Sequence, residues 1–422
     1  MTNILIVLAL VLGVLAIAQL ARVYELTSRL RGKREEDISP GDNRLNAALW
    51  WVFMVVYYIF FFWLFFRYRD RMLPISGSEH GEALDKLLNF NWIILFIAFF
   101  LTNTLLFWFA GKYYFRQGRR AFYYPHNNKL ELLWTVVPAA VLAVIIIYGL
   151  RTWNEITEPG TGDMEVVELY AKQFDWTARY PGKDGMLGAT DFRLINGTNP
   201  LGVVTRETVA TRMQELADEL AEIEERLANE VLPDDQVAEL HDRTAYLQRM
   251  RGRITDLRTE MEQDIAEKGE ASPYLAGADD LVIKEFHLPL RKEAKLLIRS
   301  RDVIHSMYLP HMRAQMNAVP GMTTTFRMRP TVSTDSMRIV TGNPEFNYVL
   351  LCNKICGASH YNMQMDLVVE SQEAYDQWMA GQTPFQAPAG AEEAPADEAA
   401  PATEEGTATE EAADAMTAMN EN

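Results

Sequence analysis

Four long apolar segments within the first 150 residues restrict the folds that are open to this chain. They cover residues 4–20, 47–66, 92–110 and 130–150, and the second one contains the unusually aromatic run WWVFMVVYYIFFFWLFF. Crossing the hydrocarbon core of a bilayer takes roughly 20 apolar residues. One such segment could be a buried helix of a soluble protein, but four in so short a stretch predict membrane-spanning helices.

The loops between these segments predict their orientation. Loop 21–46 carries six Lys or Arg, loop 67–91 carries four, and loop 111–129 carries five. Loops rich in Lys and Arg stay on the cytoplasmic side. With the first and third loops inside, both termini and everything after about residue 151 lie outside, as in a multi-pass protein of a bacterial-type inner membrane. A signal peptide cleaved after Ala18 is the alternative; because its first residues carry no basic side chain, an uncleaved helix is favoured.

The charge is distributed unevenly along the chain. Residues 1–150 hold 15 Lys or Arg against 10 Asp or Glu, residues 151–384 hold 25 against 37, and residues 385–422 hold none against 10. This acidic outer part argues against nucleic acid as a partner, because phosphates would be repelled, and it favours a basic protein. The tail, rich in Ala, Pro, Glu and Thr, is predicted to be disordered. It is either a solubilising segment or an electrostatic attractor for a basic protein.

After the fourth apolar segment the pattern changes to short strands. MEVVELYAKQFDWTARYP is interpreted as one alternating strand, and DDLVIKEFHLPL, AKLLIRSRDVIH, MTTTFRMRP and FNYVLLC are interpreted as further strands. Several short strands separated by turns predict a β-sandwich or a Greek-key barrel. The predicted fold class is therefore a membrane-anchored α + β protein, with N-terminal transmembrane helices followed by a Greek-key β-domain.

A helical segment interrupts this β pattern. Apolar residues recur at steps of three and four from Val209 to Leu227 and again from Val237 to Met261, with Pro233 between the two runs. This heptad pattern predicts an antiparallel coiled-coil hairpin inserted at 205–268. It is either packed only on itself or a docking arm for another subunit. The predicted domains are 1–90, 91–152, 160–380 with the insert, and the tail 385–422.

Both cysteines of the chain lie in the segment LCNKICGASHYNM. Cys352 and Cys356 are four residues apart, His360 follows four residues later, and Met363 three residues after that. Thiolates and thioethers are soft ligands that favour copper, whereas a zinc site has little use for methionine. Two thiolates indicate two bridged metal ions and require a second histidine, for which His305 in RDVIHSMYLP is best placed. The alternative is a disulfide beside a buried methionine.

These motifs resemble the binuclear copper centre, Cu-A, of cytochrome c oxidase subunit II. HNNKLELLWTVVP, KQFDWTARYP, DVIHS and NAVPGM are similar to further motifs of that family and occur in its order, over about residues 90–190 and 280–380. The resemblance implies a cupredoxin-like outer domain. It also implies a terminal respiratory oxidase, in which the copper pair accepts electrons from cytochrome c and passes them to haem in subunit I.

The resemblance also assigns the copper ligands. It places them at His305, Cys352, Cys356, His360 and Met363, with the backbone carbonyl of Lys354 as the sixth donor. The family usually has a glutamate at position 354, whose side chain helps to bind Mg²⁺ or Mn²⁺ at the boundary with subunit I. An ammonium group cannot ligate a cation. Copper is therefore expected, and the second metal is not expected in its usual form.

Three further residues receive roles from the resemblance. Phe174 stands where the family has the tryptophan at which electrons arrive from cytochrome c, or from a cytochrome c domain. Trp176 is either a second residue of that kind or a core side chain. Glu131 matches a glutamate at the entrance of a proton channel into subunit I, although a carboxylate in the first turn of a helix is also stabilised by the helix dipole alone.

The expected partners are oxidase subunit I, other oxidase subunits, membrane lipid and, through 205–268, a respiratory supercomplex partner. A copper-free quinol oxidase subunit II is disfavoured because every side-chain ligand is present. A stand-alone copper-delivery protein is disfavoured because it would need only one anchor.

Overall fold

The computed structural model describes residues 2–386 except 31, 33–37, 159 and 161. The chain divides into two compact units. One comprises Met1–Glu158 with Pro310–Arg313, and the other comprises Pro159–Leu309 with Ala314–Asn422. From residue 387 onward, the predicted acidic tail lies outside the described residues.

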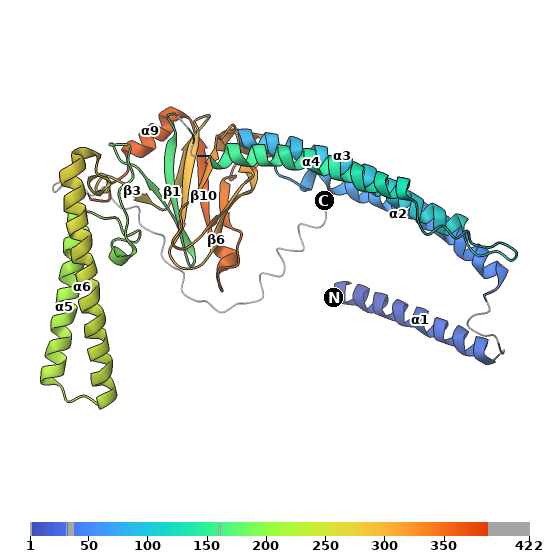
Figure 1. Ribbon diagram of the computed structural model, residues 1–422, viewed down its shortest axis with the longest axis horizontal. Coiled ribbons are helices and arrows are strands. Elements are labelled where there is room, and N and C mark those ends of the chain that lie inside the picture. The colour runs from blue at the N-terminus through green and yellow to red at the C-terminus, as the bar shows by residue number, and fades with distance from the viewer. Residues whose placement is uncertain (1, 31, 33–37, 159, 161, 387–422) are drawn as a thin grey trace. The chain divides into compact units, whose positions relative to one another are not determined.

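The first unit is built from four long helices (Figure 1). They are α1 (Thr2–Leu30), α2 (Pro40–Tyr68), α3 (Glu79–Lys112) and α4 (Asn128–Thr157). Each is long and apolar enough to cross a membrane, and each extends beyond its predicted apolar segment. At 1.5 Å per residue, α3 is about 51 Å long, whereas the hydrocarbon core measures about 30 Å. Its polar first turns therefore lie beyond the apolar stretch.

Aromatic side chains join α2 to α3. The rings of Phe61 and Phe99 stack with centroids 4.9 Å apart, and Trp51 meets Trp108 edge to face at 5.2 Å. A Cβ atom at Gly111 would lie 2.7 Å from the Trp51 indole, so the close approach of the two helices requires glycine there. The aromatic run of α2 is thus a helix-packing surface.

The short segment Pro310–Arg313 contacts the start of α3. The Arg313 guanidinium donates to both carboxylate oxygens of Asp85, at 2.9 and 3.0 Å. The Ser78 hydroxyl donates to the carbonyl of Met312 at 2.7 Å and also caps α3 by accepting from Gly81 N–H. Asp85 is therefore already neutralised by a bidentate ion pair.

The second unit contains two five-stranded sheets. The first sheet has the spatial order β3 (Leu281–Ile283), β2 (Asp175–Tyr180), β1 (Glu165–Lys172), β5 (Ala294–Ser300) and β8 (Thr324–Met328). The second has the order β4 (Phe286–Pro289), β10 (Gln364–Glu370), β9 (Tyr348–Cys352), β6 (His305–Leu309) and β7 (Ala314–Ala318). Neighbours are antiparallel except β1–β5 and β4–β10. Alternate residues of β5 and β9 are buried, as expected for strands that cover a shared core on one face.

The predicted fold class is confirmed, but three predicted strands are wrong in detail. The segment 294–305 is not one strand, because β5 ends at Ser300 and His305 begins β6 in the other sheet. The segment from Met164 to Pro181 is not one strand, because the chain turns at Gln173 and Phe174 and returns as β2 beside β1. The segment 279–290 is divided between β3 and β4, which belong to different sheets. Three short helices were not predicted: α7 (Pro273–Ala276), α8 (Thr334–Thr341) and α9 (Gln372–Ala380).

The inserted hairpin consists of α5 (Arg206–Asn229) and α6 (Asp234–Lys268), which lie side by side in Figure 1. Its apolar stripe is buried between the two helices and against Leu194 and Val204 at the base of the insert. An ion pair between Arg206 and Glu262 joins the helices at that base, with 2.7 Å between Nη2 and Oε2. The stripe is therefore used within the hairpin itself.

Candidate metal centre

The ends of two neighbouring strands position the first donors. His305 begins β6, Cys352 ends β9, and these strands are paired with Met307 opposite Cys352. The loop after β9 then folds back, because Cys352 N–H donates to the carbonyl of Met363 at 3.0 Å. A further turn, in which Met363 N–H donates to the carbonyl of His360 at 3.2 Å, keeps the loop compact. The loop thereby returns its last donors to the strand end where the first ones lie.

The structure brings all six predicted donor groups together. Nδ1 of His305 lies 3.7 Å from Sγ of Cys352, which lies 3.9 Å from Sγ of Cys356. Sγ of Cys356 in turn lies 3.6 Å from Nδ1 of His360 and 3.8 Å from Sδ of Met363. The carbonyl oxygen of Lys354 is 3.3 Å from Sγ of Cys352, while the Lys354 side chain is exposed. The cysteines are free thiols, so the alternative of a disulfide does not describe this fold.

The donor set suits a soft metal. Two thiols, two imidazoles, a thioether and a carbonyl surround one small volume, and His305, Cys352 and Cys356 form a group that could hold a metal ion. Soft sulfur ligands with imidazole favour copper. Six donors exceed the four that a single tetrahedral ion takes. The residues present therefore fit the copper that the motifs predict.

Burial, together with the neighbouring Cys352, raises the pKa of the Cys356 thiol to about 11. A buried thiol of this kind stays protonated at neutral pH unless a cation is bound. A coordinated thiol is deprotonated outright, because the charge of the ion outweighs the cost of burial. The Cys356 thiol is thus arranged to be neutral alone and anionic beside a bound cation.

Asp302 and Gln173 support the centre, and neither was singled out from the sequence. Asp302 Oδ1 lies 2.8 Å from Nε2 of His305, and Oδ2 accepts from Gln173 N–H at 2.8 Å. The Gln173 side chain donates to the carbonyl of Cys356. Burial raises the pKa of Asp302, but hydrogen bonds from Gln173, His305 and Val303 outweigh it and hold that pKa below its ordinary value. An acidic residue three positions before His305 was the available signal, since metal-binding histidines commonly bond a carboxylate.

Phe174 and Trp176 occupy different environments. A Cβ atom at Gly357 would lie 2.8 Å from the Phe174 ring, so this half-buried ring lies directly on the backbone next to Cys356. Trp176 is completely buried and meets the His305 ring at 6.4 Å between centroids. Phe174 is therefore accessible at the surface beside the centre, and Trp176 lies behind it.

Glu131, the predicted proton-channel residue, lies elsewhere, and so do His287 and His311, which are not predicted as ligands. Glu131 is in the first turn of α4, where its Oε1 accepts from Asn127 N–H at 3.2 Å. His287 stacks on Trp378 with centroids 4.0 Å apart and shares a hydrogen bond with Glu370. His311 belongs to the first unit. The contact between Glu131 and Asn127 has the geometry of a helix cap, and the stacking of His287 on Trp378 is a packing contact.

Fold and site together define a chain with four helices that are long and apolar enough to cross a membrane, followed by a β-domain in which two cysteines and a histidine could hold a metal ion. The family model described as cytochrome c oxidase subunit II, transmembrane domain, matches residues 69–152, and the model described as its periplasmic domain matches residues 262–372. These two matches support a subunit II of a haem–copper oxidase, the family that the sequence motifs resemble. Helices α1 and α2, α5 and most of α6 lie outside both matches.

Two relatives found by sequence agree with this assignment. The alternative cytochrome c oxidase subunit 2 of Bradyrhizobium diazoefficiens is 28% identical over 310 residues, which cover 73% of this chain and 83% of that protein. Cytochrome c oxidase subunit 2 of Thermostichus vulcanus is 23% identical over 338 residues, covering 79% and 85%. The crystal structure of the periplasmic domain of subunit II from Bradyrhizobium japonicum has a TM-score of 0.25 and 13% identity, covering 52% of this chain and 94% of that one.

Proposed function

We propose that this chain holds the binuclear Cu-A centre of a terminal cytochrome c oxidase. The convergence of two thiols, two imidazoles, one thioether and one carbonyl on a single volume carries this proposal. The ligands are His305, Cys352, Cys356, His360, Met363 and the carbonyl of Lys354. The bound copper pair would accept electrons singly from a cytochrome c and deliver them to haem in subunit I, where oxygen is reduced to water with proton translocation.

The residues of the chain have separate tasks in this proposal. Cys352 and Cys356 lie at the middle of the donor set and balance the charge of the cations. Asp302 holds the His305 imidazole in one orientation through Nε2. Phe174 presents a ring to the electron donor beside the Cys356 loop, with Trp176 packed behind it.

The membrane part completes the proposal. All four helices span the membrane with both termini outside, and Glu131 at the inner start of α4 leads protons toward subunit I. The domains are two additional helices over 1–90, the family hairpin over 91–152 and the copper domain over 160–380. The insert at 205–268 contacts a further respiratory complex, through its outer surface rather than its apolar stripe. With lysine at position 354, no Mg²⁺ or Mn²⁺ site of the usual kind is proposed.

Electron paramagnetic resonance of the purified full chain loaded with copper tests the function. We expect one unpaired electron shared equally by two copper nuclei. Met363→Leu should alter this spectrum, whereas Met365→Leu, a matched change of another buried methionine two residues later, should leave it unchanged. A signal from isolated single copper ions would instead support a simple copper-binding module and refute the binuclear centre.

A further inference from the structure

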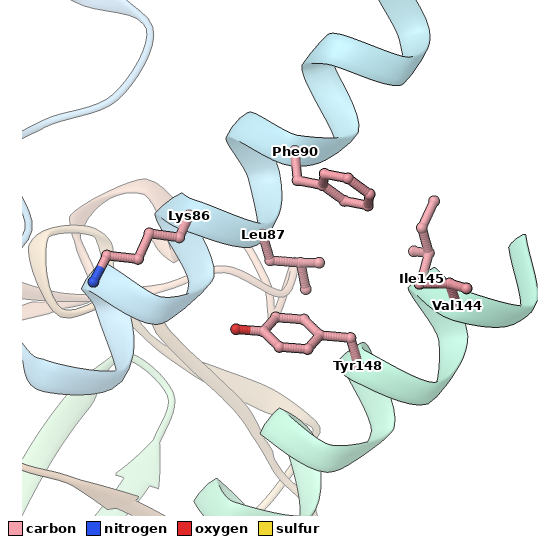
Figure 2. Close-up of a pocket in the computed structure, with 6 residues that line it drawn as sticks. All are labelled: Lys86, Leu87, Phe90, Val144, Ile145 and Tyr148. Carbon is pink, nitrogen blue, oxygen red and sulfur yellow. The ribbon is translucent and has the colours of Figure 1, made fainter. Parts of the chain in front are cut away.

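A groove lies between α3 and α4 and is not used by the metal centre. Its volume is about 230 Å³, and it is lined by Lys86, Leu87 and Phe90 from α3 and by Val144, Ile145 and Tyr148 from α4. Figure 2 shows the apolar side chains converging between the two helices, with the Lys86 ammonium and the Tyr148 hydroxyl toward one end. The lining is thus apolar along its length and polar at one end.

The polar end coincides with the edge of the apolar stretch on both helices. Lys86 is the last charged residue of α3 before Lys112, and Tyr148 is three residues before Arg151, the first charge of α4 after Glu131. Lysine and tyrosine at such a boundary place their polar atoms at headgroup depth and their apolar parts in the hydrocarbon. In the proposed orientation, this boundary faces the outer leaflet.

The Lys86 ammonium is not neutralised by its neighbours. The adjacent carboxylate, Asp85, is engaged by the Arg313 guanidinium in a bidentate pair. Over the described ranges of the chain, the Lys86 side chain has no ion-pair or hydrogen-bond partner. A cation held at headgroup depth beside an apolar groove complements a molecule with a phosphate at one end and a hydrocarbon chain at the other.

We propose that this groove binds an anionic phospholipid, with one acyl chain between α3 and α4 and the phosphate at Lys86. The chain of the lipid covers Leu87, Phe90, Val144 and Ile145, and each buried methylene adds to the affinity. The phosphate oxygens accept from the Lys86 ammonium and from the Tyr148 hydroxyl. The inference goes beyond electron transfer and rests only on the proposed membrane orientation of these two helices.

Native mass spectrometry of the delipidated oxidase complex, titrated with dioleoyl phosphatidylglycerol in neutral detergent, tests this. We expect Lys86→Gln to weaken the tightest phosphatidylglycerol binding about tenfold, the scale of one lost charge-assisted hydrogen bond. Val144→Trp, which fills the groove, should abolish it. Lys112→Gln, at the other end of α3, is the matched control and should bind as the wild type does. Dioleoylglycerol and glycerol 3-phosphate should each bind more weakly than the intact lipid.

Equal binding by the wild type and all three variants would overturn the proposal. A photoreactive benzoylphenylalanine at Phe90 identifies the occupant directly, and we expect it to be attached to lipid. Attachment to another polypeptide would show that a protein helix fills the groove and would also overturn the proposal. Native mass spectrometry detects bound lipid whether or not copper is present. A failure of the lipid proposal can therefore be distinguished from a failure of the proposed copper centre.

Discussion

Asp302 connects the two parts of the site that are far apart in sequence. One carboxylate oxygen bonds the His305 imidazole and the other accepts from Gln173 N–H in the turn that carries Phe174. Since both oxygens are engaged, Asp302 fixes the ring and the turn together. Partners of this kind set the orientation and basicity of metal-binding histidines.

Replacing Asp302 with asparagine should therefore weaken copper binding. Asparagine has only one acceptor oxygen and no charge, so it cannot serve both His305 and Gln173. We expect Asp302→Asn to lower copper affinity by about 10–100-fold, measured by competition with a chelator. Asp366→Asn, an exposed acid on β10, is the control and should retain full affinity. Equal affinity in both variants would contradict the role of Asp302.

Phe174 is half-buried at the surface, whereas Trp176 is completely buried, so the two residues can be tested separately. We expect Phe174→Ala to raise the KM for reduced cytochrome c by about tenfold or more, because truncation of a central aromatic contact has that scale. Phe174→Trp should preserve a low KM. Phe192→Ala, at another exposed phenylalanine on the loop before the hairpin, provides the comparison. An unchanged KM in steady-state turnover of Phe174→Ala would place the donor contact elsewhere.

The five side-chain donors of the site could be predicted from the sequence, because their spacing and softness are local properties of two segments. The Lys354 carbonyl is implied only by the family resemblance. Asp302 and Gln173 could not be assigned in the same way. Their contacts depend on the turn between β1 and β2 lying beside the Cys356 loop, which is a consequence of the whole β-domain. The separation of Phe174 from Trp176 has the same cause, because the first is on the turn and the second is already inside β2.

At the scale of elements, the inserted hairpin has a core of its own. Leu216 on α5 is completely buried in the cluster that also contains Leu247 and Ile254 of α6. We expect Leu216→Ala to destabilise the hairpin by about 2–5 kcal/mol, the usual cost of such a cavity. Hydrogen exchange of α5 and α6 should rise, while the copper spectrum stays unchanged. Glu222→Ala, an exposed change on the same helix, should change neither the stability of the hairpin nor its hydrogen exchange. A changed copper spectrum in Leu216→Ala would show that the hairpin and the metal site are coupled.

A buried ion network joins β1 and β2 of the first sheet to Asp280, just before β3, and to the loop at Gly188. Nε of Arg179 lies 2.6 Å from Oε2 of Glu168, and its Nη1 lies 3.0 Å from Oδ2 of Asp280. Asp280 also accepts a hydrogen bond from Gly188 N–H at 3.0 Å. Burial raises the pKa of Asp280 from 3.8 to about 7, against the opposing effect of Arg179. Between these values the folded chain keeps a proton that the unfolded chain releases, so this group makes stability fall as pH rises.

Asp280→Asn should remove that dependence. We expect the stability of the wild type relative to the variant to decrease from pH 4 to pH 7, by on the order of 1 kcal/mol per pH unit at most. Above pH 7 the difference should be constant. Urea unfolding of the full chain, followed by near-ultraviolet circular dichroism, measures it. A difference that is flat over this range would mean that Arg179 keeps Asp280 ionised throughout.

Some elements were predictable from the sequence and others were not. Two predictions depend only on single segments: the helical hairpin from the heptads of α5 and α6, and long apolar helices at α2 to α4. The structure confirms both. The segment 279–290 was misinterpreted because a strand that changes sheets keeps the same alternating pattern on both sides of the change. The turn at Gln173 between β1 and β2 could not be predicted, because residues 172–175 contain neither glycine nor proline, the strongest turn signals.

At the scale of the molecule, charge is segregated along the chain. The part up to residue 150 is slightly basic, and the remainder carries the acidic excess that makes the net charge −17. Such a field raises the association rate of an oppositely charged partner and is screened by salt. The proposed cytochrome donor would meet this field before it meets Phe174. Electron transfer from a basic cytochrome c should therefore slow as ionic strength rises.

The acidic tail permits the sharpest test of this field. Residues 387–422 contain ten of the 57 acidic residues of the chain and none of its 40 basic residues. We expect their deletion to slow association with a basic cytochrome c by roughly a few-fold at low salt, since full electrostatic steering is worth about 10–1,000-fold. At 1 M salt, where the Debye length is about 3 Å, the difference should vanish. Stopped-flow reduction of the copper centre measures both limits. A variant whose tail has the same length but carries amides in place of the ten acids separates the effect of charge from that of solubility. If this variant associates with cytochrome c as fast as the native chain does, the tail only keeps the protein soluble.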